Sequence, residues 1–183
     1  MGIFVGLLRS INVGGRNRVP MADLRTLVSS LGFDDVATYL QSGNVVFTAS
    51  GSATVVARAI QDRIASELGL EVPVIVRSRR QLEAIVRSPP FADLHVDPKT
   101  RHVTFLAAVA RPPAVEELEA LADRFGTDQF VVTGSEVFLY CPGGYGETKL
   151  SNTYLERRLG VTATTRNWRT VTALAEMAGI TGD

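Results

Sequence analysis

The feature that most constrains the fold of this chain is an order of strands and helices that occurs twice. In the first half, period-two and β-branched runs predict four strands, and two stretches with apolar residues at helical spacing lie between them. The predicted order is strand, helix, strand, strand, helix, strand. The second half predicts the same order. The 183 residues therefore divide into two units of about 90 residues each, a usual size for a small domain.

Turn residues and helix caps set the bounds of the expected elements. Pro20 suits a first helical turn, and glycines follow the ends of the helices. We expect strands over residues 3–8, 36–40, 45–48 and 72–76 in the first half, and over 102–109, 129–133, 136–140 and 162–165 in the second. We expect helices over residues 21–31, 54–68, 115–125 and 152–159, with a further helix after each unit at 79–87 and 168–178.

Both halves match the split βαβ or ferredoxin-like unit, in which two helices lie on one face of a four-stranded antiparallel sheet. Three markers support a repeat, because Gly43 and Gly134, Gly69 and Gly160, and Arg77 and Arg166 lie 91, 91 and 89 residues apart. We therefore expect an α+β fold of two ferredoxin-like units in tandem. The first covers residues 1–88 with its trailing helix, a proline-containing linker covers 89–100, and the second unit with the C-terminal helix covers 101–183.

The composition is that of a soluble globular protein, with 45% hydrophobic residues and equal numbers of basic and acidic side chains, 19 of each. This balance excludes a uniformly basic nucleic-acid binder and an acidic tail. A single cysteine, Cys141, excludes an intrachain disulfide and fits a reducing compartment, so we expect a cytoplasmic protein. No apolar run approaches the roughly 18 residues that cross a bilayer, so we expect no membrane partner.

The neutral total conceals a separation of charge along the chain. Residues 1–22 contain three arginines and no acidic residue, and residues 145–170 contain five basic and two acidic residues, whereas residues 111–136 contain two basic and six acidic residues. A local basic site is therefore compatible with the net charge of zero.

The first candidate site is the glycine-containing loop between the first strand and the first helix. Adjacent glycines let backbone N–H groups converge, a helix start adds positive potential, and arginines add formal charge, so the loop favours an anion. It matches neither the Walker loop nor the Gly-x-Gly-x-x-Gly pattern of dinucleotide folds. The alternative is an ordinary connection with solvated arginines. The candidate ligand-binding residues are Arg9, Asn12, Gly14, Gly15 and Arg16.

The second candidate is the hairpin Gln41-Ser42-Gly43-Asn44, from which Gln41 and Asn44 are candidate ligand-binding residues. Turn chemistry alone explains this sequence, because Gly43 suits a positive φ and its polar neighbours can bond to the turn backbone. A role in binding requires that Gln41 or Asn44 face the glycine loop.

The third candidate lies in the second half, where Lys149 belongs to a long glycine-rich loop that leads into a helix and can complement a phosphate. In the segment Arg166-Asn167-Trp168-Arg169, Arg166 adds charge and Trp168 offers a ring on which a base can stack. The alternatives are a surface connection for Lys149, an N-cap for Asn167, as Ser78 with Gln81 provides in the first unit, and a core position for Trp168.

The sequence indicates neither a metal site nor a catalytic assembly. His95 and His102, near Asp93 and Asp97, are too loosely spaced for a metal site. Cys141 has no histidine close to it in sequence. We therefore nominate no catalytic residue, no metal ligand and no cofactor.

Three separated stretches resemble a bacterial family called domain of unknown function 1697: residues 7–15 (LLRSINVGG), 41–47 (QSGNVVF) and 165–168 (TRNW). The resemblance covers essentially the whole chain, with Ser10 standing where the family pattern usually has glycine. It implies a pair of ferredoxin-like units and carries no established activity.

Three functional hypotheses follow. The leading one is binding of an anionic ligand, a nucleotide or a nucleic-acid segment, by the glycine-rich loops and the Arg-Asn-Trp segment. The second is an enzyme that acts on a phosphorylated small molecule, in which Lys149 and Arg166 stabilise negative charge. The third is a structural module that forms homo-oligomers through its sheet edges.

Overall fold

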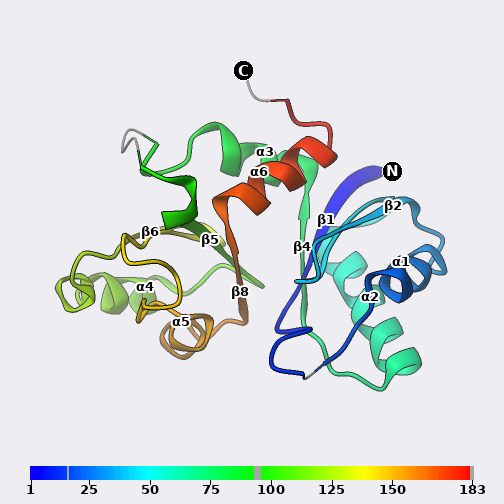
Figure 1. Ribbon diagram of the computed structural model, residues 1–183, viewed down its shortest axis with the longest axis horizontal. Coiled ribbons are helices and arrows are strands. Elements are labelled where there is room, and N and C mark those ends of the chain that lie inside the picture. Colours follow the sequence, from blue (N-terminus) through cyan, green and yellow to red (C-terminus); the bar gives the residue numbers. More distant parts are fainter. Residues whose placement is uncertain (16, 93–95, 182–183) are drawn as a thin grey trace. The chain divides into compact units, whose positions relative to one another are not determined.

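Short runs of apolar and β-branched residues build the sheet of the first unit, and the strands Gly2–Leu8, Asn44–Ala49 and Val74–Ser78 are buried along most of their length on both faces. The computed structural model describes residues 1–15, 17–92 and 96–181 (Figure 1). The chain forms two units, Met1–Arg87 with Ala173–Asp183, and Ser88–Thr172.

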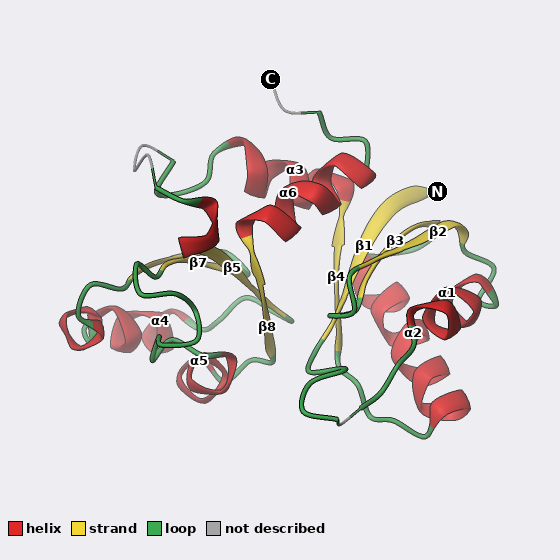
Figure 2. Cartoon of the chain, viewed as in Figure 1, coloured by secondary structure: helices red, strands yellow, loops and turns green. Residues whose placement is uncertain are grey.

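The first unit contains an antiparallel sheet in the order β2-β3-β1-β4. Its strands are β1 (Gly2–Leu8), β2 (Asp34–Tyr39), β3 (Asn44–Ala49) and β4 (Val74–Ser78), and its helices are α1 (Met21–Ser29), α2 (Ala53–Leu68) and α3 (Arg79–Arg87). Helices α1 and α2 lie on one face of this sheet (Figure 2). The order and the single helical layer are those of a ferredoxin-like unit.

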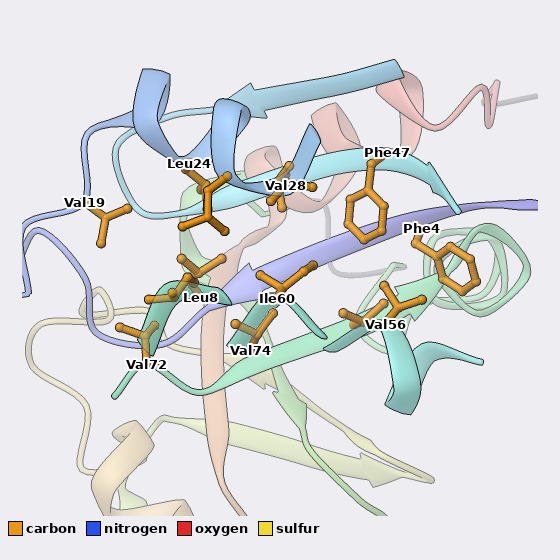
Figure 3. Packing of buried hydrophobic residues seen from close by; sticks show 14 of the residues in the cluster. Phe4, Leu8, Val19, Leu24, Val28, Phe47, Val56, Ile60, Val72 and Val74 are labelled. Carbon is orange, nitrogen blue, oxygen red and sulfur yellow. The ribbon is translucent and has the colours of Figure 1, made fainter. Parts of the chain in front are cut away.

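The core of the first unit lies between this sheet and α1 and α2. Phe4, Leu8 and Val76 contribute from the strands, and Val56 and Ile60 contribute from α2. Figure 3 shows Phe4, Phe47 and Val56 at one end of this core, where the rings of Phe4 and Phe47 stack with centroids 6.1 Å apart.

The second unit has the same topology, with its strands in the order β6-β7-β5-β8. Its strands are β5 (Arg101–Leu106), β6 (Gln129–Thr133), β7 (Glu136–Tyr140) and β8 (Ala163–Asn167), and its helices are α4 (Pro112–Glu119) and α5 (Asn152–Leu159), with short 3-10 turns at Pro98–Thr100 and Ala122–Phe125. Helix α6 (Trp168–Met177) follows β8. Helices α4 and α5 lie on one side of the sheet (Figure 2). A second apolar core fills the space between these helices and the sheet.

The expected fold class is confirmed, and several element bounds differ from expectation. The strand expected to reach Val109 ends at Leu106. The helix expected over residues 115–125 begins at Pro112 and ends at Glu119, because Pro112 and Pro113 suit the first helical turn and the chain then tightens into a 3-10 turn.

The division into units also differs from the expected one at both ends of the second unit. Residues 173–183 group with the first unit, where Arg79 Nη2 donates to the carbonyl oxygen of Gly179 over 2.7 Å. The described part of the expected linker belongs to the second unit, since the ring of Phe91 lies 6.1 Å from that of Tyr140.

The two sheets share one strand register. The β1–β4 pairs Phe4–Ser78, Gly6–Val76 and Leu8–Val74 correspond to the β5–β8 pairs His102–Asn167, Thr104–Thr165 and Leu106–Ala163. Because β1 and β5 correspond at an offset of 98 residues and β4 and β8 at 89, no single offset aligns the units. The register also corrects one marker: Gly43 corresponds to Ser135 rather than to Gly134, because Leu8 N bonds to Gly43 O and Leu106 N bonds to Ser135 O.

Among the described residues, none of the helices combines the length and the apolar character that crossing a bilayer requires.

Candidate functional site

The loop between β1 and α1 contains an unusual run of left-handed backbone. Among the described residues of this loop, three other than glycine have positive φ: Ser10 and Asn12 at 55° and Asn17 at 47°. Gly14 and Gly15 add φ values of 58° and 74°. Such conformations are uncommon outside glycine, although asparagine tolerates them best, and they persist only where surrounding contacts hold them.

The contacts that hold this loop come mainly from the side chain of Asn12. Its Nδ2 donates to the carbonyl oxygens of Val19 at 2.9 Å and Gln41 at 2.7 Å, and its Oδ1 accepts from the Val19 N–H at 2.8 Å. The Asn12 N–H donates to Asn17 O at 3.1 Å. Both amide hydrogens of Asn12 are therefore used to join the two ends of the loop to each other and to the β2–β3 hairpin.

The hairpin is packed against the same loop through Gly43. A Cβ atom at this position would lie 2.6 Å from Ile11 Cδ1 and 2.8 Å from Leu8 Cβ, and its φ is +78°. Only glycine therefore fits here without displacing the buried Ile11 and Leu8. The hairpin and the glycine loop form one structural element at the end of β1.

Of the hairpin candidates, Gln41 contacts the loop through its carbonyl oxygen, and its side chain is exposed. Asn44 is fully buried, and its Nδ2 donates to Tyr39 O at 2.8 Å and to Ser42 Oγ at 3.0 Å. Asn44 therefore acts within the turn, as turn chemistry predicts.

The apex of the loop is exposed, unlike its base. No atom of the described part of the chain lies within 4 Å of a Cβ built on Gly14 or Gly15, and Val13 is 67% exposed. Arg18 is exposed and makes no ion pair with any described residue, whereas Arg9 is half-buried and bonds through Nη1 to Ser10 Oγ. Arg16 lies outside the described residues. The structure thus brings Arg9, Asn12, Gly14, Gly15, Gln41 and Asn44 together around one loop.

The remaining candidates belong to the second unit and differ in exposure. Lys149 is exposed. Arg166 is buried at 8% exposure, and its Nη1 donates to Thr164 Oγ1 at 2.8 Å and to Thr165 O at 2.9 Å. Burial lowers the pKa of Arg166 to about 10, although nearby Tyr145 opposes this shift.

Arg166 has a counterpart at the same register position of the first unit. Arg77 is buried there at 5% exposure, and its Nη1 likewise donates to the carbonyl of the preceding residue, Val76, at 3.1 Å. A buried arginine on this strand is thus shared by the two units, which favours a structural role for Arg166 over a role in ligand binding.

Trp168 is 9% exposed, and the Arg101 guanidinium lies over its ring, 5.1 Å from the centroid. Its ring face is therefore occupied by an arginine, as in a core position, rather than presented for base stacking. Asn167 caps α6, since its Oδ1 accepts from Thr170 N at 2.8 Å. In the first unit, Ser78 Oγ accepts from Gln81 N at 3.3 Å, which confirms the expected parallel, and Gln81 Oε1 accepts in return from Ser78 N at 2.9 Å.

A polar cluster that sequence reasoning missed lies on the helix-facing side of the second sheet. Thr165 Oγ1 donates to Asn152 Oδ1 at 2.6 Å and accepts from Tyr145 OH at 3.1 Å, and Thr104 Oγ1 lies 2.6 Å from it. The rings of His102 and Tyr145 stack with centroids 4.9 Å apart. The sequence signal that identifies these positions is the alternation along β5. Residues 102–106 (HVTFL) correspond to residues 4–8 of β1 (FVGLL), so the polar residues His102 and Thr104 stand where β1 has Phe4 and Gly6.

Burial governs the titration of the other reactive groups in this unit. It lowers the pKa of His102, and the nearby backbone of Thr100 opposes this shift. It raises the pKa of the Cys141 thiol to about 11, opposed by a hydrogen bond with the Thr148 side chain, and so favours the protonated thiol. Within the described residues, no group of three or more histidine, cysteine or acidic side chains could hold a metal ion; His95 and Asp93 lie outside them.

Comparison with known proteins identifies both a family and a fold. A family model described as "Protein of unknown function (DUF1697)" matches residues 1–138. The solved structure of the conserved bacterial protein SP0830 from Streptococcus pneumoniae is similar to 97% of this chain and to 98% of its own chain, with a TM-score of 0.73 and 24% sequence identity. At this identity the likeness shows the fold alone. No curated protein matches the chain.

Proposed function

This chain belongs to the DUF1697 family of proteins of unknown function, and we propose that it binds an anionic ligand, a nucleotide or a segment of nucleic acid, through the glycine loop of its first unit. One observation carries the proposal: the described residues of the range 10–17 include five with left-handed backbone, in a loop that is fastened at its base and exposed at its apex. Strained backbone that is held in this way occurs preferentially at functional sites.

The fastened base lowers the cost of binding. The hydrogen bonds of Asn12 fix both ends of the loop before any ligand arrives, so less conformational entropy is lost when a ligand is bound. The exposed residues Gly14 and Gly15 allow close approach to the backbone, because no described atom lies within 4 Å of a Cβ built on either glycine.

The charge of the loop selects the ligand. Residues 1–22 contain three arginines and no acidic side chain, and Arg18 is exposed without a carboxylate partner among the described residues. A guanidinium in this setting retains its donors for a phosphate group. The expected ligand is therefore a phosphate-bearing molecule, and the expected binding weakens as salt is added.

Isothermal titration with mononucleotides and with short single-stranded RNA and DNA at low salt tests this proposal. We expect binding to at least one of them, weakened roughly threefold to tenfold by Arg18→Ala, the effect of losing one exposed charged contact. Arg80→Ala is the matched control, because Arg80 is an exposed arginine beyond Ser78, which pairs with Phe4 at the opposite end of β1. Absence of binding to every one of these ligands contradicts the proposal.

A further inference from the structure

The glycine-rich loop of the second unit takes the place of two turns of helix. Helices α2 and α5 end at equivalent left-handed glycines, Gly69 and Gly160, but α2 has 16 residues and α5 has 8. Counting back from these glycines, residues 144–151 stand where α2 has its first eight residues. The segment that supplies the buried core residue Val56 in the first unit is therefore a loop in the second.

The strand positions beneath this loop also differ in polarity between the two units. By register, Phe4, Gly6 and Val76 of the first unit correspond to His102, Thr104 and Thr165 of the second. The first unit shows that this fold is complete with the apolar side chains of Phe4 and Val76 and with a glycine, Gly6, at these positions. Burial of the polar side chains of His102 and Thr104 instead, with Thr165 half-buried beside them, has a desolvation cost, so their presence calls for a reason other than the fold.

The hydroxyl groups of this cluster are arranged around Thr165. Its one hydroxyl hydrogen goes to Asn152 Oδ1, so Thr104 and Tyr145 must both donate to Thr165 Oγ1. The Tyr145 ring meanwhile stacks on His102, with an angle of 29° between the ring planes. Tyr145 is thus bound as a ligand would be, with its ring on an aromatic face and its polar edge on a hydroxyl.

His102 is the one member of the cluster that carries an unsatisfied atom. It is 7% exposed, and its buried Nδ1 has no hydrogen-bond partner among the described residues. An unpartnered buried nitrogen lowers stability, and Phe4 shows that a residue without this cost fits the equivalent position. A ligand with hydroxyl groups beyond its ring can satisfy this nitrogen, because a hydroxyl both donates and accepts; the phenol of Tyr145 does not do so.

We propose that Tyr145 fills a ring-binding slot between the glycine-rich loop and the sheet of the second unit, and that this slot takes the base of an uncharged nucleoside when the loop moves Tyr145 out. The side chains that hold Tyr145 in the slot include those of His102 and Thr165, and Thr104 and Asn152 bond to Thr165; these hydrogen-bonding groups suit a planar polar ring. A nucleoside also brings ribose hydroxyls for the His102 nitrogen. This site is separate from the anion site proposed in the first unit.

Removal of Tyr145 tests the slot directly. In the full chain, Tyr145→Ala should bind p-cresol, the tyrosine side-chain analogue, and at least one of adenosine, guanosine, cytidine and uridine, each seen by calorimetry and as a rise in melting temperature. Wild-type protein should bind the same nucleoside at least tenfold more weakly, because Tyr145 competes for the slot. Arg18→Ala and added salt should leave nucleoside binding unchanged, which separates this site from the anion site.

The outcomes are distinct. A folded Tyr145→Ala protein that binds neither p-cresol nor a nucleoside overturns the proposal, and so does one that binds p-cresol alone, because the slot then accepts only the chain's own phenol. If Tyr145→Ala does not fold, Tyr145→Phe replaces it, because it keeps the ring and removes the hydrogen bond to Thr165. It should bind the nucleoside roughly fivefold more tightly than wild type, and unchanged or weaker binding overturns the proposal.

Discussion

The side-chain amide of Asn12 donates a hydrogen bond to the carbonyl oxygen of Gln41 over 2.7 Å, across 29 residues of sequence. The same amide also binds both backbone polar groups of Val19. Asn12 therefore sets the conformation of the glycine loop and its position on the hairpin, and it has no amide hydrogen left for a ligand. Its contribution to binding is to hold the loop, while the apex and the arginines meet the ligand.

Asn12→Ala should destabilise the protein and the loop together. The substitution removes three hydrogen bonds and leaves backbone groups of Val19 and Gln41 without partners, so we expect a loss of about 2 kcal/mol in the free energy of unfolding. Urea denaturation measures this loss. Asn17→Ala is the matched control, because Asn17 is also left-handed but its side chain makes one hydrogen bond to the described residues, at 3.3 Å to Ser10 O. Equal losses in the two variants would show that the bonds of Asn12 add nothing.

Gly43→Ala should destabilise the first unit by about 3 kcal/mol, the sum of a clash with Ile11 and Leu8 and of backbone strain at positive φ. Gly134→Ala in the hairpin of the second unit provides the comparison, because its φ is +60° but the nearest atom lies 4.0 Å away. It should cost about 1 kcal/mol, from strain alone. Chemical denaturation of both variants measures the difference in the free energy of unfolding. A loss in Gly134→Ala as large as that in Gly43→Ala would refute the close packing of Gly43 against Ile11 and Leu8.

Most of the fold could be predicted from the sequence, because apolar spacing and caps are local signals. The strands Gln129–Thr133 and Glu136–Tyr140 and the helix Asn152–Leu159 have the expected bounds. The expected end of the first strand of the second unit was wrong because the apolar run continues to Ala110, which is buried as a loop residue after the strand has ended. Periodicity does not distinguish a buried loop residue from a strand residue.

The sites were less predictable than the fold, because they depend on contacts between distant segments. The glycine loop and hairpin were identified separately, but no sequence pattern links Asn12 to Gln41. The polar cluster of His102, Thr104 and Thr165 was missed because the offset between the units changes from 98 at β5 to 89 at β8. The markers used for the repeat gave offsets near 91, which align the first strands incorrectly.

Tyr145→Phe and Thr165→Val should destabilise the second unit by amounts that do not add. Each removes the bond between Tyr145 OH and Thr165 Oγ1, so the double variant should lose about 1 kcal/mol less than the sum of the single variants. A double-mutant cycle in urea measures this coupling. The control pair is Thr104→Val with Tyr145→Phe. Thr104 and Tyr145 each donate to Thr165, so this pair removes no bond in common and its coupling free energy should be smaller. Additive losses for the first pair would contradict the arrangement of the network.

His102→Phe should make the protein less sensitive to acid. Burial lowers the pKa of folded His102 below its ordinary value of 6.5, so the unfolded chain binds protons first as the pH falls. The contribution of neutral His102 to the free energy of unfolding is fully present above about pH 6.5. It is lost as the pH falls through the lower pKa of His102 in the folded protein. Wild type should therefore lose more stability than His102→Phe between about pH 7.5 and pH 5. The other histidine, His95, is present in both proteins, so its contribution to the pH dependence cancels in the comparison. Parallel losses would contradict the burial of His102.

The salt dependence of nucleic-acid binding tests most directly the claim that the glycine loop binds an anion. The affinity for a fluorescently labelled single-stranded oligonucleotide is measured by anisotropy over a series of salt concentrations, for wild type, Arg18→Ala and the control Arg80→Ala. We expect the logarithm of the affinity to fall linearly with the logarithm of salt, with a slope smaller by about 0.7 in Arg18→Ala and unchanged in Arg80→Ala. A slope that Arg18→Ala leaves unchanged would contradict the proposed site.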